Sequence, residues 1–254
     1  MDTALKTQTT NRVVSKEEWL EARKVLLEKE KELTKMYDGV RELRAQLPWL
    51  KVEKEYIFDG ENGKESLSDL FQGRSQLIVQ HFMFAPEWEE GCVGCSFQAD
   101  HVDGARMHLE PHNVSFVAIS RAPYKVIEAF KKRMGWKFKW VSSYENDFNF
   151  DYNVSFTEEQ VNFGKGTYNF REQSIDMPEL PGTSAFYKDE SGQLFHTYSC
   201  YERGLELAVT TYVYLDIAPK GRNETGPDFS LTDWVRHHDK YNEPVEKSGG
   251  CCCE

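Results

Sequence analysis

The sequence predicts an α/β fold with a mixed central sheet, and three observations support this prediction. Between residues 77 and 141, segments rich in β-branched and aromatic residues alternate with segments of helical periodicity, an order typical of parallel strands joined by crossover helices. Two later strand-like segments flank Asp189-Glu190-Ser191-Gly192, which favours an antiparallel hairpin. The chain has 254 residues, 39% of them hydrophobic, which is enough to bury a core without disulfides.

The overall charge argues against several classes of function. A formal net charge of −11 disfavours binding to nucleic acid or to an anionic membrane, because both need clustered Lys and Arg. No apolar run approaches the roughly 18–20 residues that span a bilayer. The first ten residues are polar and match neither a secretory nor a mitochondrial targeting segment. We therefore expect a soluble, cytoplasmic protein without a transmembrane segment.

The first predicted part, residues 1–50, is an N-terminal helical extension. Ser15 and Glu18 match a capping box, and apolar residues then recur at helical spacing. Pro48 ends the predicted helix, with Gly39 as an alternative earlier end. A charged helix with a narrow apolar stripe packs either on its own domain or on a second subunit. A homodimer formed through this helix is therefore one prediction.

Residues 51–218 form the predicted main domain. It begins with a strand, a Gly-containing turn and a second short strand, followed by a helical turn that Gly73 ends. An alternating series then follows, with strands predicted at 77–84, 114–119 and 138–141 and helices predicted at 92–109 and 124–134. Pro123 and Gly135 mark the start and the end of the second helix.

The second half of the main domain contains an insertion and a hairpin. A polar, aromatic-rich insertion is predicted at about 143–180, and strands are predicted at 184–188 and 193–198. A closing helix is expected over 205–215, although its Val, Thr and Tyr residues also suit a strand. A parallel βαβ half followed by an antiparallel hairpin and a helix is the topology of the thioredoxin-like fold. Residues 219–254 are predicted to be a polar extension, loosely packed or disordered, with a Cys-rich tail.

Gly91-Cys92-Val93-Gly94-Cys95-Ser96 lies where the first of these strands leads into a helix. A C-x-x-C pair at such a junction is typical of thiol–disulfide chemistry. Residues three apart in a first helical turn lie roughly 5–6 Å apart, within the distance that a disulfide spans. The N–H groups at the helix start favour a thiolate at Cys92, whereas the nearby Glu89 and Glu90 carboxylates oppose it. We expect Cys92 to be the more exposed nucleophile and Cys95 to be the resolving thiol.

Several segments, in order along residues 13–234, resemble a family of uncharacterised proteins with a thioredoxin-like, peroxiredoxin-related (AhpC/TSA-like) fold, a domain of unknown function. The segments that carry this resemblance are Ser15-Lys16-Glu17-Glu18-Trp19-Leu20, Phe58-Asp59-Gly60, Gly73-Arg74-Ser75-Gln76-Leu77-Ile78-Val79-Gln80-His81-Phe82-Met83-Phe84, Gly91-Cys92-Val93-Gly94-Cys95-Ser96-Phe97, Ser120-Arg121-Ala122-Pro123, Arg133-Met134-Gly135-Trp136, Phe195-His196-Thr197-Tyr198-Ser199 and Tyr214-Leu215-Asp216. The resemblance implies the fold, but it transfers no particular reaction.

Two features differ from better-known families of this fold. Peroxiredoxins carry their reactive cysteine in a Pro-x-x-x-Thr/Ser-x-x-Cys pattern. Here Pro86 lies six residues before Cys92, and Glu89 and Glu90 occupy the region of the hydroxyl. Thioredoxins place a cis-proline before the strand that faces the cysteines, and the nearest candidate in this chain is Pro181.

These observations favour a thiol–disulfide oxidoreductase that uses Cys92 and Cys95, takes electrons from a thiol donor and needs no organic cofactor or metal. Its thiol or disulfide substrate and its electron-donor protein are unknown. Two alternatives stay open: a non-catalytic binding or scaffold protein that interacts through the N-terminal helix, and a thiolate metal site. His108 lies about 24 Å along the helix from Cys92, so a metal would need ligands from elsewhere, such as His81, His196 or the C-terminal tail.

Several other histidine, arginine and cysteine residues could have either a structural or a functional role. His81 and His196 fall within strand patterns and are predicted to be hydrogen-bonded core or half-buried residues. Arg121 is predicted to form a structural ion pair, with an anionic substrate as the alternative partner. Cys251-Cys252-Cys253 is interpreted as part of a functionless extension. The functional alternatives are palmitoylation of these thiols, binding of soft metal ions, and electron transfer to Cys92.

Overall fold

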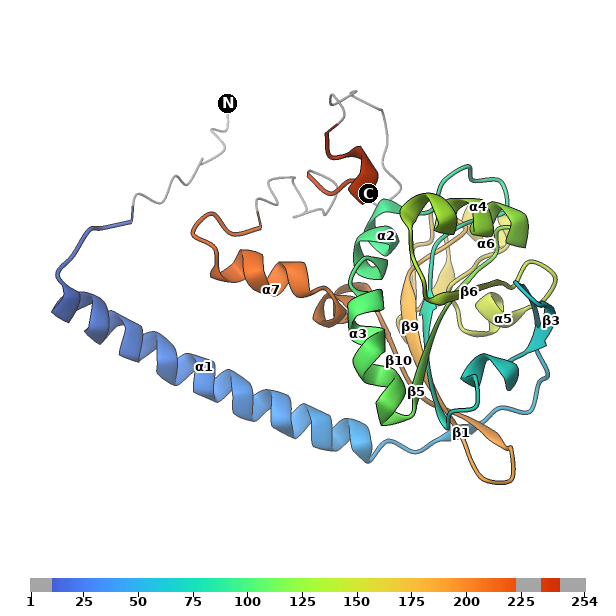
Figure 1. The fold of residues 1–254 in the computed structure, drawn as a ribbon, viewed down its shortest axis with the longest axis horizontal. Helices are drawn as coiled ribbons and strands as arrows, with labels where there is room; N and C mark the ends of the chain where they lie inside the picture. The colour runs from blue at the N-terminus through green and yellow to red at the C-terminus, as the bar shows by residue number, and fades with distance from the viewer. Residues whose placement is uncertain (1–10, 223–233, 243–254) are drawn as a thin grey trace. The chain divides into compact units, whose positions relative to one another are not determined.

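The computed structural model describes residues 11–222 and 234–242, and the chain divides into two compact units between Leu47 and Pro48 (Figure 1). The described part of the smaller unit is dominated by one long helix, and the larger unit contains a sheet with its covering helices. Within the described ranges, no helix is both long and apolar enough to cross a membrane.

Helix α1, Lys16–Ala45, begins at the predicted capping box. Ser15 Oγ accepts a hydrogen bond from the Glu18 N–H at 3.2 Å, and the Glu18 carboxylate accepts one from the Ser15 N–H at 3.3 Å. Gly39 does not end the helix, because one glycine costs only about 1 kcal/mol and the Arg41–Asp38 ion pair spans its position. Earlier turns carry the pairs Lys24–Glu21, Lys29–Glu32 and Lys31–Glu28. None of the thirty described residues of α1 is buried.

The main sheet of the larger unit has, among the described residues, eight strands in the order β1-β10-β9-β4-β5-β6-β2-β3. The strands are β1 Leu50–Lys51, β2 Ile57–Gly60, β3 Gly63–Ser66, β4 Gln76–His81, β5 Val114–Ser120, β6 Lys139–Ser142, β9 Gly182–Lys188 and β10 Leu194–Tyr201. The β4, β5 and β6 strands are parallel, whereas β9 runs antiparallel to β4 and β10 antiparallel to β9. This arrangement confirms the predicted thioredoxin-like topology with its mixed sheet.

The helices differ from the prediction at two places. The helix predicted over 92–109 is two helices, α2 Val93–Ala99 and α3 Val102–Leu109. Between them Asp100 accepts a hydrogen bond from the Trp136 indole N–H at 2.7 Å, which anchors the break to a distant segment. The helix predicted over 205–215 is a 3₁₀-helix, Glu202–Ala208, followed by α7, Thr210–Ile217.

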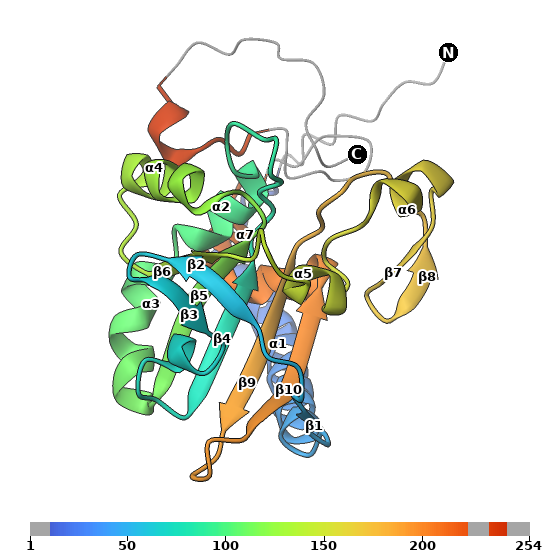
Figure 2. The same cartoon turned by 90° about the vertical axis from the view of Figure 1, so that its right-hand side faces the viewer.

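Several further elements match the prediction, others belong to the insertion, and the strand predicted over 77–84 is β4, which ends at His81. Strand β1 and the 3₁₀-helices Glu110–His112 and His238–Lys240 were not predicted. Helix α4, Tyr124–Met134, ends at Gly135 with φ of 69°, as a C-terminal glycine should. A 3₁₀-helix, Asp69–Phe71, forms the predicted helical turn. The insertion contains α5 Phe148–Asp151, α6 Glu158–Phe163 and the hairpin of β7 Gly166–Tyr168 with β8 Arg171–Gln173. Figure 2 shows that α6 and this hairpin lie to one side of the main sheet.

The two faces of the sheet carry separate cores, because side chains alternate along each strand. Along β4, Leu77 and Val79 pack on the face covered by the Asp69–Phe71 turn and by α5. Beyond β4, Phe82 packs on the other face with residues of α2, α3 and α4. The two cysteines therefore lie on the α2 side of the sheet, together with a cluster of large aromatic side chains.

One segment of the extension that was predicted to be loosely packed is in fact well packed. Residues 234–242 are described, and Val235 and His237 there are 2% and 3% exposed. Val235 packs with Phe97 and Tyr212, so tertiary contacts order a segment whose composition alone suggested a loose extension. The Cys251-Cys252-Cys253 tail lies outside the described residues.

Candidate functional site

The loop after β4 places Cys92 at the start of α2. Cys92 is the N-cap residue, and its N–H donates to the Met83 carbonyl at 3.0 Å. In return, the Cys92 carbonyl accepts hydrogen bonds from the Ser96 N–H at 2.9 Å and from Ser96 Oγ at 2.8 Å. The backbone of Cys92 is therefore held both to the strand end and to the first helical turn.

Cys95 follows in the first turn of α2 and is held by two contacts to the strand end. The Met83 N–H donates to Cys95 Sγ at 3.4 Å, and Gln80 Nε2 donates to the Cys95 carbonyl at 3.0 Å. Cys95 is 3% exposed and Cys92 is 9% exposed. Both residues are therefore buried in the apolar cluster on this face of the sheet, Cys92 slightly less than Cys95, and Cys92 lies in the wall of a cavity rather than on the exposed surface that was expected.

A cavity of about 500 Å³ opens beside both thiols. Its walls come from the β4–α2 junction, from the insertion, and from the segment that leads into α7. The apolar and aromatic lining residues are Met83, Phe97, Tyr168, Met177, Leu180, Pro181, Leu205, Val209 and Tyr212. Pro181, the proline singled out by comparison with thioredoxins, directly precedes β9, and its peptide bond is trans.

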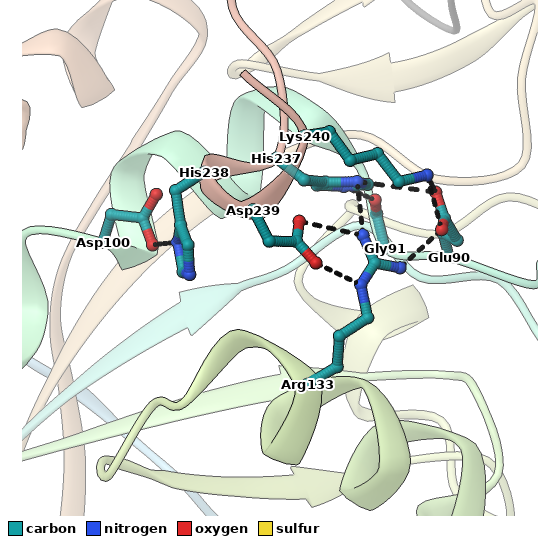
Figure 3. A network of polar contacts seen from close by, with 8 residues as sticks. All are labelled: Glu90, Gly91, Asp100, Arg133, His237, His238, Asp239 and Lys240. Carbon is teal, nitrogen blue, oxygen red and sulfur yellow. Dashed lines mark hydrogen bonds and ion pairs between the residues drawn. The ribbon is translucent and has the colours of Figure 1, made fainter. Parts of the chain in front are cut away.

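A cluster of ion pairs surrounds the loop that precedes Cys92 (Figure 3). Glu90 accepts hydrogen bonds from Arg133, and from Lys240 Nζ at 2.8 Å and 3.0 Å. Burial opposes ionisation of Glu90, but its bonds with Lys240 and Arg133 outweigh burial and lower its pKa. The tertiary structure thus offsets the Glu90 charge that the sequence places near Cys92.

The segment 234–242 also contacts both ends of α2. His237 Nε2 lies 2.9 Å from the Gly91 carbonyl, directly before Cys92, and His238 Nδ1 lies 2.6 Å from Asp100, the C-cap residue of α2 (Figure 3). Burial lowers the pKa of His237, more than the bond to Gly91 raises it. Sequence analysis missed these residues, since about 140 positions separate them from Cys92 and no local pattern links the two.

His81 and His196 belong to a buried chain of hydrogen bonds. His81 Nε2 lies 2.7 Å from Ser184 Oγ, Ser184 Oγ lies 2.7 Å from Ser199 Oγ, and His196 Nε2 lies 2.7 Å from Ser199 Oγ. The His81 ring also stacks on Phe148, which packs on the sheet face opposite to the cysteines. Both histidines are core or half-buried residues, as predicted.

Arg121 forms the structural ion pair that the sequence suggested. Its guanidinium lies 3.4 Å from the Glu179 carboxylate, which is 1% exposed, and 4.4 Å from the centre of the Phe150 ring. Burial raises the pKa of Glu179 to about 7, although Ser155 and Arg121 oppose this shift.

Among the described residues, the fold does not bring together a set of ligands for the alternative hypothesis of a thiolate metal site. Across residues 11–222 and 234–242, no three His, Cys, Asp or Glu side chains form a group able to hold a metal ion. His101 is committed to the Phe97 carbonyl at 2.8 Å and to Thr211 Oγ1 at 2.7 Å.

Comparisons with known proteins place the chain in a family and relate it to several solved structures. A model of the family described as "Bacterial protein of unknown function (DUF899)" matches residues 8–241. No curated protein matches the chain significantly. Peroxidoxin BcpB from Mycobacterium tuberculosis is 15% identical, with a TM-score of 0.42 and coverage of 65% of this chain and 95% of its own.

Two further structures show similarity of the same order. Peroxiredoxin Q from Xanthomonas campestris is 12% identical, with a TM-score of 0.43 and coverage of 63% and 89%. A putative thiol:disulfide interchange protein DsbE from Chlorobium tepidum is 12% identical, with a TM-score of 0.40 and coverage of 65% and 98%.

Proposed function

The chain belongs to the DUF899 family of bacterial proteins of unknown function, and we propose that it exchanges thiols and disulfides through Cys92 and Cys95. One observation carries this proposal: two thiols three residues apart, at the start of one helix, line the same ligand-sized cavity. A structural pair of cysteines needs no cavity, whereas a substrate disulfide must reach one of the sulfur atoms.

The proposed reaction has two steps. The Cys92 thiolate attacks one sulfur of a substrate disulfide, so that a Cys92–substrate disulfide forms and one substrate thiolate leaves and takes up a proton. The Cys95 thiolate then attacks the Cys92 sulfur, and the second substrate thiol leaves. The substrate gains two electrons, and Cys92 and Cys95 end as a disulfide. A thiol donor returns the pair to the reduced state by the same exchange and becomes oxidised to a disulfide.

The surroundings of the two sulfur atoms support their different roles. Cys92 is the less buried of the two, as the attacking thiol must be. Cys95 receives the Met83 N–H at its sulfur, a donor that can stabilise negative charge there when Cys95 attacks. The pairing of Glu90 with Arg133 and Lys240 removes one source of repulsion from the loop before Cys92.

The test compares single serine variants in a chain whose Cys251, Cys252 and Cys253 are also serine, so that only the site is followed. We expect Cys95→Ser to accumulate a mixed disulfide with a small disulfide substrate, seen by intact-mass spectrometry. Cys92→Ser should accumulate none. Cys200→Ser is the matched control, because Cys200 does not line the cavity, and it should behave as the parent chain does. A Cys92 that reacts no faster than a free thiol near neutral pH would remove the proposal.

A binding or scaffold role is the second candidate, and α1 favours it. This helix exposes several large apolar side chains, among them Trp19, Leu26 and Leu33. In that case the cysteines would be spectators. A Cys92→Ser, Cys95→Ser double variant that keeps the cellular phenotype of the parent chain would favour this role over exchange.

A further inference from the structure

The residues that line the cavity indicate which class of substrate can reach Cys92. We propose that the substrate disulfide is a small apolar molecule without anionic groups, and that the cavity discriminates against acidic peptide disulfides such as glutathione disulfide. This proposal rests on the exchange function proposed above and specifies its substrate class. It is argued from the size, the lining and the charge of the cavity.

The size of the cavity fits one small molecule. Its volume of about 500 Å³ falls within the range of roughly 300–1,000 Å³ that is typical of small-ligand sites. Both thiols line it, so a molecule held there lies next to the reacting sulfur atoms.

The lining selects for apolar groups. Around the thiols stand the side chains of Phe97, Met177, Leu180, Leu205 and Val209. They come from three separate parts of the chain, α2, the insertion and the segment around the start of α7. Burial of apolar substrate surface against such walls is favourable, whereas a charged group placed there would lose its hydration without a partner.

The charges around the cavity disfavour anions. The lining includes three carboxylates, those of Asp176, Glu202 and Glu206, and one cation, Arg203. Arg203 is already paired with Glu206, with contacts of 2.9 Å and 3.3 Å. Glu206 also pairs with Arg222 at 3.0 Å, and Glu202 pairs with Arg171 at 3.6 Å. Among the described residues of the lining, Asp176 is therefore the carboxylate with no ion pair, and an anionic substrate would meet this charge without an uncommitted cation.

The test uses the reduced full-length chain and four symmetrical disulfides, whose different leaving thiols are corrected for by a reference reaction with a free small thiol. They are dibutyl disulfide, bis(2-hydroxyethyl) disulfide, the dianionic 3,3′-dithiodipropionate, and glutathione disulfide. The measured quantity is the second-order rate of Cys92 oxidation, divided by the rate of a free small thiol with the same disulfide. We expect the normalised rate to be about tenfold higher for dibutyl disulfide than for the hydroxyethyl compound, the gain of a few buried methylenes. The two anionic disulfides should be slowest.

A substitution that reverses the charge of one lining residue distinguishes an effect on substrate specificity from an effect on the fold. Asp176→Lys should raise the ratio of the normalised rate with dithiodipropionate to that with dibutyl disulfide several-fold. Glu190→Lys is the matched control: it makes the same charge change on an exposed turn that does not line the cavity. It should alter neither rate.

The possible outcomes separate the two proposals. Equal normalised rates for all four disulfides, or a faster reaction with the anionic ones, would overturn the substrate class while leaving the exchange function in place. Equal responses to Asp176→Lys and Glu190→Lys would overturn the charge argument in the same way. Absence of reaction with every disulfide would overturn the exchange function, and this proposal with it.

Discussion

Gly91 is the residue on which the position of Cys92 depends most directly. A Cβ at this position would lie 2.6 Å from Cε1 of Phe82 and 3.1 Å from Cε1 of Phe130. Both rings are buried in the core beneath α2 and α4. The loop can therefore pass over these rings only where the residue before Cys92 has no side chain.

We predict that Gly91→Ala destabilises the chain by about 1–3 kcal/mol, the usual cost of overpacking a core, and that it changes the alkylation rate of Cys92. Urea denaturation and iodoacetamide kinetics measure the two effects. Gly104→Ala, within α3, is the control, because nothing lies within 4 Å of its Cβ. It should be neutral or stabilising by up to about 1 kcal/mol. Equal stability of the two variants would contradict this account.

His81 gives the protein a specific dependence of stability on pH. Burial, with a smaller effect of His196, lowers the pKa of His81 from 6.5 to about 3. Below pH 6.5 the unfolded chain takes up a proton at this residue while the native chain does not. The contribution of His81 to stability is therefore complete above pH 6.5, and it decreases as the pH falls toward 3 by about 1.4 kcal/mol per unit.

We expect the difference in unfolding free energy between the parent chain and His81→Asn to change in that direction between pH 7.5 and 4.5. Urea denaturation at several pH values measures it. His112→Asn replaces an exposed histidine and serves as the control, with a difference that should stay nearly constant. If the difference in unfolding free energy between the parent chain and His81→Asn did not vary with pH, His81 would not be a buried, neutral histidine in the native state.

At the scale of elements, the segment 234–242 acts as a clamp on the start of α2. Arg133 on α4 bonds Asp239 at 2.7 Å and also pairs with Glu90 (Figure 3). It thereby connects the segment, the loop before Cys92 and α4. Its guanidinium is partly buried, and its loss deprives Asp239 of this partner and leaves Glu90 paired with Lys240.

We predict that Arg133→Gln lowers stability by about 1–3 kcal/mol and raises the alkylation rate of Cys92, because the loop before it loses one of the contacts that hold it in place. The comparison variant is Arg41→Gln, which breaks an exposed pair with Asp38 on α1, expected to contribute at most about 1 kcal/mol. Identical Cys92 reactivity in both variants would show that the clamp does not control access to the thiol.

Helix α1 carries a heptad pattern of exposed apolar side chains. Its members recur at spacings of seven, with others three residues further on, and are Trp19, Leu26, Leu33, Met36, Val40 and Leu43. All of them are at least 44% exposed. A stripe of this period is the seam of a two-stranded coiled coil, so we keep the prediction of a homodimer through this helix.

Light scattering coupled to gel filtration tests that prediction. The parent chain should have the mass of a dimer, and Leu26→Glu, Leu33→Glu should have the mass of a monomer, since charge in the seam is unfavourable. Lys24→Glu, Lys31→Glu has the same spacing on another face of α1 and should remain dimeric. A monomeric parent chain would rule this prediction out.

At the scale of the whole molecule, the larger unit is expected to fold without the smaller one. It contains the four apolar clusters found among the described residues, whereas α1 contributes no buried side chain. A chain that begins at Pro48 also keeps β1, whose Leu50 pairs with His196 of β10. We predict that removal of residues 1–47 leaves the urea unfolding midpoint of the remaining chain unchanged. A truncated protein that is unfolded under native conditions would contradict this.

Much of the fold could be predicted from local patterns. Pro123 and Gly135 delimit α4 because each acts on the backbone at its own position. The 189–192 turn joins two strands for the same reason. The break between α2 and α3 could not be predicted, because it depends on Trp136, a residue from another element, which binds Asp100. The ordered structure of residues 234–242 could not be predicted either, because it also depends on contacts with residues of other elements.

The sequence alone determined that two cysteines stand one helical turn apart after a buried strand, because spacing and helix start are properties of a few neighbouring residues. The tertiary structure decided what surrounds those sulfur atoms. Met177 and Val209 reach the cavity, and Arg133 and Lys240 reach Glu90, only when segments up to about 150 residues apart pack together. Contacts of that kind follow from the packing of the sheet and its helices, and no local pattern encodes them.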